Sequence, residues 1–330
     1  MFDAKSGYWQ FLVRPEDRWL TAFVTHEGLY EWVRMPFGLR NAGATFVRAV
    51  TRILQPLQDF AWSYVDDMAV GSGDWPSHFD HAAQFLSTIK EAGLTSSISK
   101  CEFAKSEVHL LGHIVGSGTK RADQQRLSGI AEMPRPTTKK EVRRLLGALG
   151  YYREYVPHVA QMAKPLTDLT HKDSPNTVQW AESHERSFIA LQRSLSSPPV
   201  LAIPCVGESF VLHTDASGFA VGAALGQCDR KGVERPIAFA SQKLSGSQLG
   251  WAVIEKEAYA IIWALNRLRE IIFGSRITVL CDHNPLQYIR EYAPKSAKLL
   301  RWSLALHEFD VEVKYTKGSQ NVVADYLSRT

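Results

Sequence analysis

The sequence predicts a multidomain protein of the α/β and α+β class, with a mixed sheet and packed helices in its C-terminal block. Three observations lead to this prediction. The 330 residues are enough for two or three domains, each with its own core. Proline-rich segments at 133–142 and 196–205 divide the chain into blocks. The last block alternates strand and helix patterns in the order βββαβαβα.

The first block contains one short hairpin pattern. "WSYVDDMAV", residues 62–70, places Asp66 and Asp67 between two short apolar runs. Asp is a common turn residue, so strand, turn, strand is the plain interpretation. The alternative is that this pair also holds metal ions, which requires further carboxylates elsewhere in the chain.

The middle block is predicted to be helical, and it is basic. Thr138 and Glu141 fit a capping box that opens a helix through residues 141–155. Residues 120–172 contain eleven Lys and Arg against five Asp and Glu, an excess larger than the net charge of +4 of the whole chain. A basic span between more acidic blocks indicates contact with a polyanion, and a solvated helical surface explains it equally well.

The last block has the clearest pattern. Its predicted elements are, in order, strands at 209–218, 219–227 and 235–242, a helix at 251–272, a strand at 276–282, a helix at 296–306, a strand at 309–316 and a short helix at 321–329. This order calls for a mixed sheet with helices packed on it.

Acidic residues stand at apolar positions of this block. In the long helix Glu257 lies on the apolar stripe, whereas Glu255 points about two-fifths of a turn away from it. Asp215 and Asp282 each end a strand whose other residues are expected to be buried. A carboxylate on a buried face is costly unless it is paired or bound to metal. A salt bridge explains one such acid, but three in one small domain favour metal.

Composition excludes several classes of protein. Hydrophobic residues make up 45% and charged residues 22%, which is ordinary for a soluble globular chain. No apolar run approaches the roughly 20 residues of a membrane span, and the N-terminus has no signal-peptide pattern. The four cysteines are far apart and form no C-x-x-C motif, which argues against zinc and disulfides and fits a reducing compartment.

Eight sequence blocks, taken together, resemble a known family. "FDAKSGYWQF", "MPFGLRNAGATF", "YVDD" and "HLLGHIV" resemble the blocks of a retroelement reverse transcriptase. "HTDASGFAVGAAL", "EKEAYAIIWAL", "CDHNPL" and "NVVADYLSR" resemble the RNase H domain that follows it. Each block is weak evidence alone. Their order and spacing over essentially the whole chain indicate a gypsy-type LTR retrotransposon polyprotein.

The resemblance implies an RNA-directed DNA polymerase with ribonuclease H activity. It places a palm with partial fingers at residues 1–118, a basic thumb and connection at 119–205, and an RNase H-like domain at 206–330. The implied partners are an RNA template, a DNA primer, an RNA–DNA hybrid and dNTPs, with a homo-oligomer allowed and no membrane. The implied location is intracellular, in a cytoplasmic particle.

Two other functions stay open. One is a non-polymerising relic, or a repurposed protein that only binds nucleic acid. The other is a transposase with an RNase H-like fold, which the Asp-Glu-Asp-Asp order and the neighbouring palm disfavour.

The resemblance also assigns residues. Seven acids are expected to be catalytic and to bind two Mg²⁺ per active site, or Mn²⁺ in its place. They are Asp3, Asp66 and Asp67 in the palm, and Asp215, Glu257, Asp282 and Asp325 in the RNase H domain. Tyr8 would exclude a 2′-hydroxyl, Phe37 and Gly38 would contact the nascent base pair and template, and Gly112 would form the primer-grip turn. Arg143 and Arg144, in the basic span, are expected to contact phosphates.

The chemistry explains these residue types. Both reactions displace at phosphorus, with attack by a 3′-hydroxyl in one and by water in the other. The protein has to hold two divalent ions about 4 Å apart and align the substrate. Mg²⁺ prefers oxygen ligands, so carboxylates are expected rather than His or Cys. The ions also offset the repulsion among clustered carboxylates, which would otherwise raise their pKa values.

Two departures from the family pattern are visible. Gly43 stands where the family usually has Pro. The chain starts two residues before Asp3, so the first fingers segment, with basic residues for the incoming triphosphate, would lie upstream. From this we expect hybrid cleavage by this chain to be much stronger than DNA synthesis.

Overall fold

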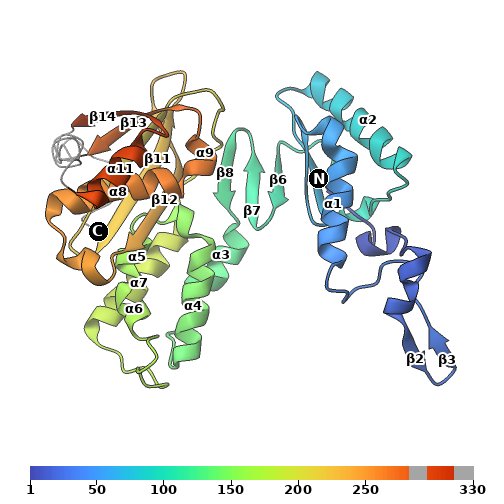
Figure 1. The fold of residues 1–330 in the computed structure, drawn as a ribbon, viewed down its shortest axis with the longest axis horizontal. Helices are drawn as coiled ribbons and strands as arrows, with labels where there is room; N and C mark the ends of the chain where they lie inside the picture. The colour runs from blue at the N-terminus through green and yellow to red at the C-terminus, as the bar shows by residue number, and fades with distance from the viewer. Residues whose placement is uncertain (282–295, 316–330) are drawn as a thin grey trace. The chain divides into compact units, whose positions relative to one another are not determined.

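The structure is a computed structural model that describes residues 1–281 and 296–315. The chain divides into two compact units, Met1–Leu110 and Leu111–Thr330 (Figure 1). In the described part of the chain, no helix is both long and apolar enough to cross a membrane.

The first unit is built on a three-stranded antiparallel sheet in the order β1–β5–β4. Strands β4 (Ala61–Tyr64) and β5 (Asp67–Val70) form the hairpin predicted at 62–70, which is confirmed. Tyr64 pairs with Asp67, so the turn between them has two residues. The short strand β1 (Phe2–Asp3) pairs along the other edge of β5.

Two helices cover one face of this sheet (Figure 1). Helix α1 (Ala42–Leu54) packs on β4 and helix α2 (Trp75–Glu91) packs on β5. Phe46 of α1, Phe85 of α2 and Met68 of β5 form the centre of the core. The remaining elements are η1 (Gly7–Gln10), η2 (Pro15–Thr21), β2 (Phe23–Thr25), β3 (Gly28–Tyr30), η3 (Gln55–Leu57), η4 (Ile98–Lys100) and β6 (Glu107–Leu110).

The second unit begins with a helical part. Its elements are β7 (His113–Gly116), β8 (Thr119–Ala122), α3 (Gln124–Ala131), α4 (Lys139–Tyr151), η5 (Arg153–Tyr155), α5 (Val159–Met162), α6 (Lys164–Asp168), α7 (Glu182–Ser196) and β9 (Leu201–Ala202). The predicted capping box is confirmed, because the Thr138 side chain accepts from Glu141 N and the Glu141 carboxylate accepts from Thr138 N. One core, centred on Tyr155, joins these helices to Ala224 and Phe239 of the following sheet.

That sheet has five strands in the order β12–β11–β10–β13–β14. Strands β10 (Phe210–Ala216), β11 (Ala220–Cys228) and β12 (Glu234–Lys243) are antiparallel, whereas β13 (Arg276–Cys281) and β14 (Asp310–Tyr315) run parallel to β10. The predicted mixed sheet is therefore confirmed. The other elements here are η6 (Gly246–Gly250), α8 (Val253–Arg267), α9 (Arg269–Ile272) and α11 (Ala297–Leu306).

One predicted helix differs from the structure, and another lies outside the described residues. The long helix predicted at 251–272 is divided at Leu268, whose φ of −103° and ψ of 9° leave the helical range, so that α9 is a separate turn. Because Leu268 and Ile272 both remain buried, the break keeps the apolar stripe on the sheet. The short helix predicted at 321–329 lies outside the described residues.

His158 lies between the helical part and the sheet of the second unit. Its burial should make the free energy of unfolding depend on pH. The side chain is only 8% exposed, and among the described residues its Nδ1 atom has no hydrogen-bond partner. Burial lowers the pKa of His158 to about 4, against about 6.5 in an unfolded chain. The unfolded state therefore binds a proton between these values that the folded state does not. The stability that neutral His158 contributes is fully present above about pH 6.5 and is lost as the pH falls toward 4.

At pH 5 the expected loss from this group is about 2 kcal/mol in the free energy of unfolding. The check is denaturant unfolding at pH 7 and pH 5, for the wild-type chain and for His158→Asn. Asn tolerates the left-handed backbone at this position, where φ is 48°. The pH effect should be smaller in the variant by that amount, and equal effects in the two chains would contradict the assignment.

Candidate active sites

In the first unit the three predicted palm acids lie together. Asp3 of β1 is the cross-strand partner of Asp67 in β5. Asp66 is the second residue of the hairpin turn, and its carbonyl oxygen accepts from Ala4 N at 3.1 Å. Side chains of directly paired residues point to the same face of a sheet. Asp3 and Asp67 therefore project on the face opposite the helix-covered core, with Asp66 next to them.

The turn that presents Asp66 is strained. Val65, a β-branched residue, has a φ of 50° in the left-handed region. Such a conformation costs roughly 1–3 kcal/mol and is typical of functional sites. Gly7 gives the Asp66 carboxylate its room, because a Cβ atom on Gly7 would lie 3.0 Å from Asp66 Oδ1 and 2.8 Å from the Phe46 ring. The strained turn at Val65 and the close approach of Gly7 therefore confine the Asp66 carboxylate.

The electrostatics of this cluster are those of like charges held together. Burial raises the pKa of Asp66 and of Asp67, and the negative charge of Asp3 raises both further. Lys100 opposes this at Asp66 and lies 3.6 Å from Asp3 Oδ1. Three acidic oxygen donors that repel one another suit a hard divalent cation. As the side chains lie, however, no three His, Cys, Asp or Glu residues within 1–281 and 296–315 form a complete metal-binding group.

The predicted nucleotide contacts lie in the same unit. The Tyr8 ring packs between Phe37 and Phe46, with ring centroids 5.2 and 5.5 Å away. Phe37 is exposed, and Gly38 has a φ of +91°, which favours glycine. A Cβ atom on Gly43 would lie 3.3 Å from the Tyr8 hydroxyl. The departure from the family pattern at Gly43 therefore leaves space for that hydroxyl.

Position 112, the second residue of the second unit, requires glycine for two reasons. Its φ is +73°, and a Cβ atom would lie 2.8 Å from Arg126 Nη1 and 3.0 Å from the Tyr151 hydroxyl. The Gly112 carbonyl accepts from the Tyr152 hydroxyl at 3.4 Å. A sharp, crowded turn of this kind fits the predicted grip turn.

The second unit holds the acids predicted for RNase H chemistry. Asp215 lies near the end of the central strand β10, and Glu257 is in the first turns of α8, a helix that packs on β10 and β11. Glu257 is only 2% exposed, as its position on the apolar stripe predicts. Glu255 points elsewhere and pairs with Lys298 Nζ at 2.6 Å. Asp282 and Asp325 lie outside the described residues.

The predicted phosphate contacts, Arg143 and Arg144, are both exposed on α4. Arg143 Nη2 donates to the Thr170 carbonyl at 3.0 Å, so this residue also fastens α4 to the segment after α6. Part of the charge of the basic span is neutralised by acids of the same unit. The ion pairs are Lys120–Glu154, Arg126–Asp123, Arg135–Glu185 and Lys164–Asp168. The span therefore presents less free charge than its sequence suggests.

Four residues near the palm acids were not predicted from the sequence. Gly7 and Lys100 touch the palm cluster, and Trp62 and Tyr64 are exposed on the face of the sheet that carries Asp67. Alternation in β4 could have revealed the aromatic pair, because two large exposed side chains alternate there with buried or partly buried ones. No local pattern points to Lys100, since its contact with Asp3 spans most of the unit.

Comparison with known families defines the class of protein. Residues 1–115 match the family described as reverse transcriptase (RNA-dependent DNA polymerase). Residues 206–309 match the RNase H-like domain found in reverse transcriptase. Two separate segments of the chain thus match the polymerase part of a reverse transcriptase and the RNase H-like domain found in reverse transcriptases.

The relatives are retrotransposon Pol polyproteins, which confirms the resemblance to the gypsy type. The chain is 39% identical to the Pol polyprotein from transposon opus of Drosophila melanogaster, covering 99% of this chain and 34% of that protein. It is 34% identical to the Pol polyprotein from transposon gypsy of the same species, again over 99% of this chain and 32% of the relative. The chain therefore spans about a third of these polyproteins.

Solved structures confirm the fold. The foamy viral protease-reverse transcriptase in complex with dsDNA has a TM-score of 0.84 at 23% identity, covering 96% of this chain and 67% of that one. The same viral enzyme in complex with an RNA/DNA hybrid has a TM-score of 0.81 at 23% identity, covering 96% of this chain and 43% of that one.

Proposed function

We propose that this chain copies an RNA template into DNA and cuts the RNA strand of the resulting hybrid, using two carboxylate centres that each hold divalent metal. The observation that carries the proposal is the pairing of Asp3 with Asp67 across the sheet, with Asp66 beside them at a strained turn. Burial and the neighbouring charge of Asp3 raise the pKa values of Asp66 and Asp67, which marks an arrangement that costs stability without a cation.

In the palm centre, Asp3, Asp66 and Asp67 would hold Mg²⁺ or Mn²⁺. The bound ions would lower the pKa of the attacking 3′-hydroxyl and offset charge on the reacting phosphate. Tyr8 would pack beneath the sugar of the incoming nucleotide, since its ring is fixed by Phe37 and Phe46. Its position there would exclude a 2′-hydroxyl, and Phe37 with Gly38 would contact the nascent base pair.

In the RNase H centre, Asp215 and Glu257 would hold the ions, together with Asp282 and Asp325 from outside the described residues. The attacking group is water, and the same oxygen ligands serve both reactions. Because Glu257 is buried on α8 next to β10, its carboxylate would be oriented before substrate arrives. A preorganised acid loses little conformational freedom on binding metal, which favours a defined geometry.

The exposed arginines of α4 should contribute to the affinity for RNA–DNA hybrid. Arg144→Glu should weaken binding to hybrid of any sequence, and it should lower the slope of log affinity against log salt by about 1. Arg144 gives a cleaner test than Arg143, whose substitution also removes the bond to Thr170.

The matched control is Arg193→Glu, the same charge reversal at an exposed position of α7 outside the basic span. The measurement is hybrid affinity from low to high salt for the three chains. Equal loss of affinity in both variants would show that only the net charge matters and that α4 makes no specific phosphate contact.

The test of the function is primer extension on an RNA template with a DNA primer, dNTPs and Mg²⁺. DNA synthesis together with loss of the RNA strand supports the proposal. A chain that binds the template–primer tightly but performs neither reaction would support the alternative, a repurposed nucleic-acid-binding protein.

A further inference from the structure

Three residues share one row across the RNase H-like sheet. Asp215 of β10 pairs with Gly222 of β11, and Gly222 pairs with Ser241 of β12. Directly paired residues of antiparallel strands project on the same face. Whatever packs on Gly222 and Ser241 therefore lies on the same row and the same face as the Asp215 side chain.

A segment of the helical part occupies that row. We call residues 158–168, which include α5 and α6, the brace. The His158 ring sits directly over Gly222, because a Cβ atom there would lie 2.7 Å from His158 Cε1 and Nδ1. Ala160 N donates to Ser241 Oγ at 2.9 Å. The brace thus covers two of the three positions, and only glycine at 222 allows the ring to come so close.

A third contact reaches the end of the strand that carries Asp215. Gln161 Nε2 donates to Ser217 Oγ at 3.1 Å. Ser217 closes the turn between β10 and β11, since its hydroxyl donates to the Ala220 carbonyl and accepts from Ala220 N, both at 3.0 Å. Because the one proton of the hydroxyl is already used, the partner at 161 has to be a donor.

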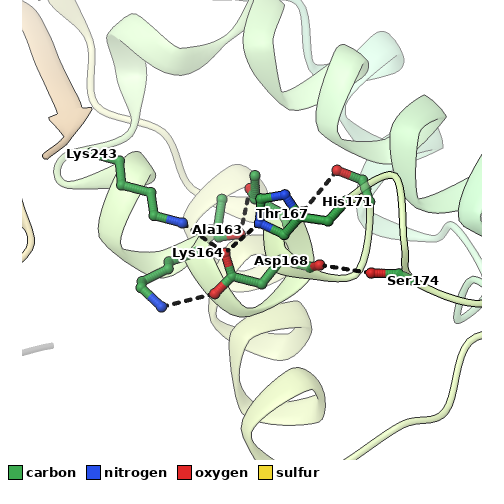
Figure 2. Close-up of polar contacts among 8 residues, drawn as sticks. Ala163, Lys164, Thr167, Asp168, His171, Ser174 and Lys243 are labelled. Carbon is green, nitrogen blue, oxygen red and sulfur yellow. Dashed lines mark hydrogen bonds and ion pairs between the residues drawn. The ribbon is translucent and has the colours of Figure 1, made fainter. Parts of the chain in front are cut away.

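The far end of the brace is fastened to the same sheet by charge. Asp168 accepts from Lys243 Nζ of β12 at 2.7 Å and from Lys164 Nζ at 2.8 Å, as Figure 2 shows. Burial alone would raise the pKa of Asp168, but the hydrogen bonds and charges of both lysines outweigh it and lower the pKa to about 2. The carboxylate therefore stays ionised over the whole physiological pH range, so the charge of this anchor does not change with pH there.

We propose that the brace is a positioning element for hybrid cleavage, in which Gln161 and His158 fix the end of β10 so that Asp215 is held ready for divalent metal. This inference rests on the proposed RNase H function. The brace belongs to the same helical part as α4, so the segment that would hold nucleic acid also supports the acid that would cut it. Substitution of groups that orient metal ligands in this way typically costs roughly 10- to 100-fold in metal affinity or activity.

The first test is Gln161→Ala, which removes the donor to the Ser217 turn. The half-saturating Mg²⁺ concentration for hybrid cleavage should rise about tenfold, while KM for hybrid and the rate at saturating Mg²⁺ stay close to wild type. Gln125→Ala, the same truncation at an exposed position of α3, should change none of these quantities. An unchanged Mg²⁺ requirement in Gln161→Ala would overturn the inference. So would an equal loss of rate at every Mg²⁺ concentration, which a merely structural role predicts.

The second test changes the close contact between Gly222 and the His158 ring. Gly222→Ala forces a Cβ atom against the His158 ring and should raise the Mg²⁺ requirement in the same way. Adding His158→Gly removes the ring and suits the left-handed backbone at 158, so the double variant should recover at least half of the change. Lack of recovery in a folded double variant would show that the contact does not transmit the effect.

A metal-binding readout separates the two proposals. The Mn²⁺-induced rise in melting temperature should require about tenfold more Mn²⁺ in Gln161→Ala than in wild type. If wild type cleaves hybrid but Gln161→Ala matches it in both readouts, the inference alone fails. If wild type does not cleave, the proposed function fails, and equal Mn²⁺ titrations of the two chains would then overturn the inference as well.

Discussion

Asp215→Asn is expected to abolish cleavage of the RNA strand in an RNA–DNA hybrid. The substitution keeps the size of the side chain but removes a negative charge and an ionised oxygen donor. The rate should fall by more than about a hundredfold, because groups that only support metal ligands are already worth roughly 10- to 100-fold. The measurement is single-turnover cleavage of a labelled hybrid in Mg²⁺. Duplex DNA should stay intact in all chains, since the 2′-hydroxyl and the minor groove of the hybrid are part of recognition.

The matched control for this experiment is Asp173→Asn, which removes the same charge from an exposed position of the same unit. Its cleavage rate should equal that of wild type. Hybrid cleavage that survives Asp215→Asn at a normal rate would show that the carboxylate at the end of β10 is not a metal ligand.

Asp66→Asn should have two opposite effects, on activity and on stability. DNA synthesis should fall by more than about a hundredfold for the reason given for Asp215. The metal-free protein should become more stable at neutral pH. Burial and the charges of Asp3 and Asp67 raise the pKa of Asp66, so the fold disfavours the ionised form that is present at pH 7. A neutral side chain removes this repulsion.

Melting temperature without metal and with Mg²⁺ checks the second effect. Wild type should be less stable than Asp66→Asn without metal and should gain more from Mg²⁺. Asp59→Asn, at an exposed position before β4, should behave as wild type in both respects. A variant that is less stable than wild type without metal, or that gains equally from Mg²⁺, would contradict the view that the three acids are held together for a cation.

The parts of the fold that follow from local sequence could be predicted. The hairpin around Asp66 and Asp67, the capping box of Thr138 with Glu141 and the burial of Glu257 each depend on residues close together in the chain. Periodicity, turn chemistry and capping operate over that range. The break at Leu268 was not predicted, because the apolar pattern continues through it without a Gly or Pro.

The long-range contacts of the sites could not be predicted from pattern. The register that places Asp3 opposite Asp67 depends on which edge of β5 the two-residue strand β1 joins. The bond from Arg143 to Thr170 and the contact of His158 with Gly222 depend equally on tertiary packing. The sequence blocks predict which acids form the sites, whereas the residues packed behind those acids follow only from the tertiary structure.

The central claim is that one chain carries two separate carboxylate centres, one for synthesis and one for hybrid cleavage. One reaction tests it most directly. The RNA template and the DNA primer carry different labels, so DNA extension and RNA cutting are read from the same sample for wild type, Asp66→Asn and Asp215→Asn, with cutting scored on a preformed hybrid included in the mixture. We expect both signals in wild type, cutting without extension in Asp66→Asn, and extension without cutting in Asp215→Asn. Loss of both signals together in either folded variant, or survival of a signal in the variant that should lack it, would contradict the claim.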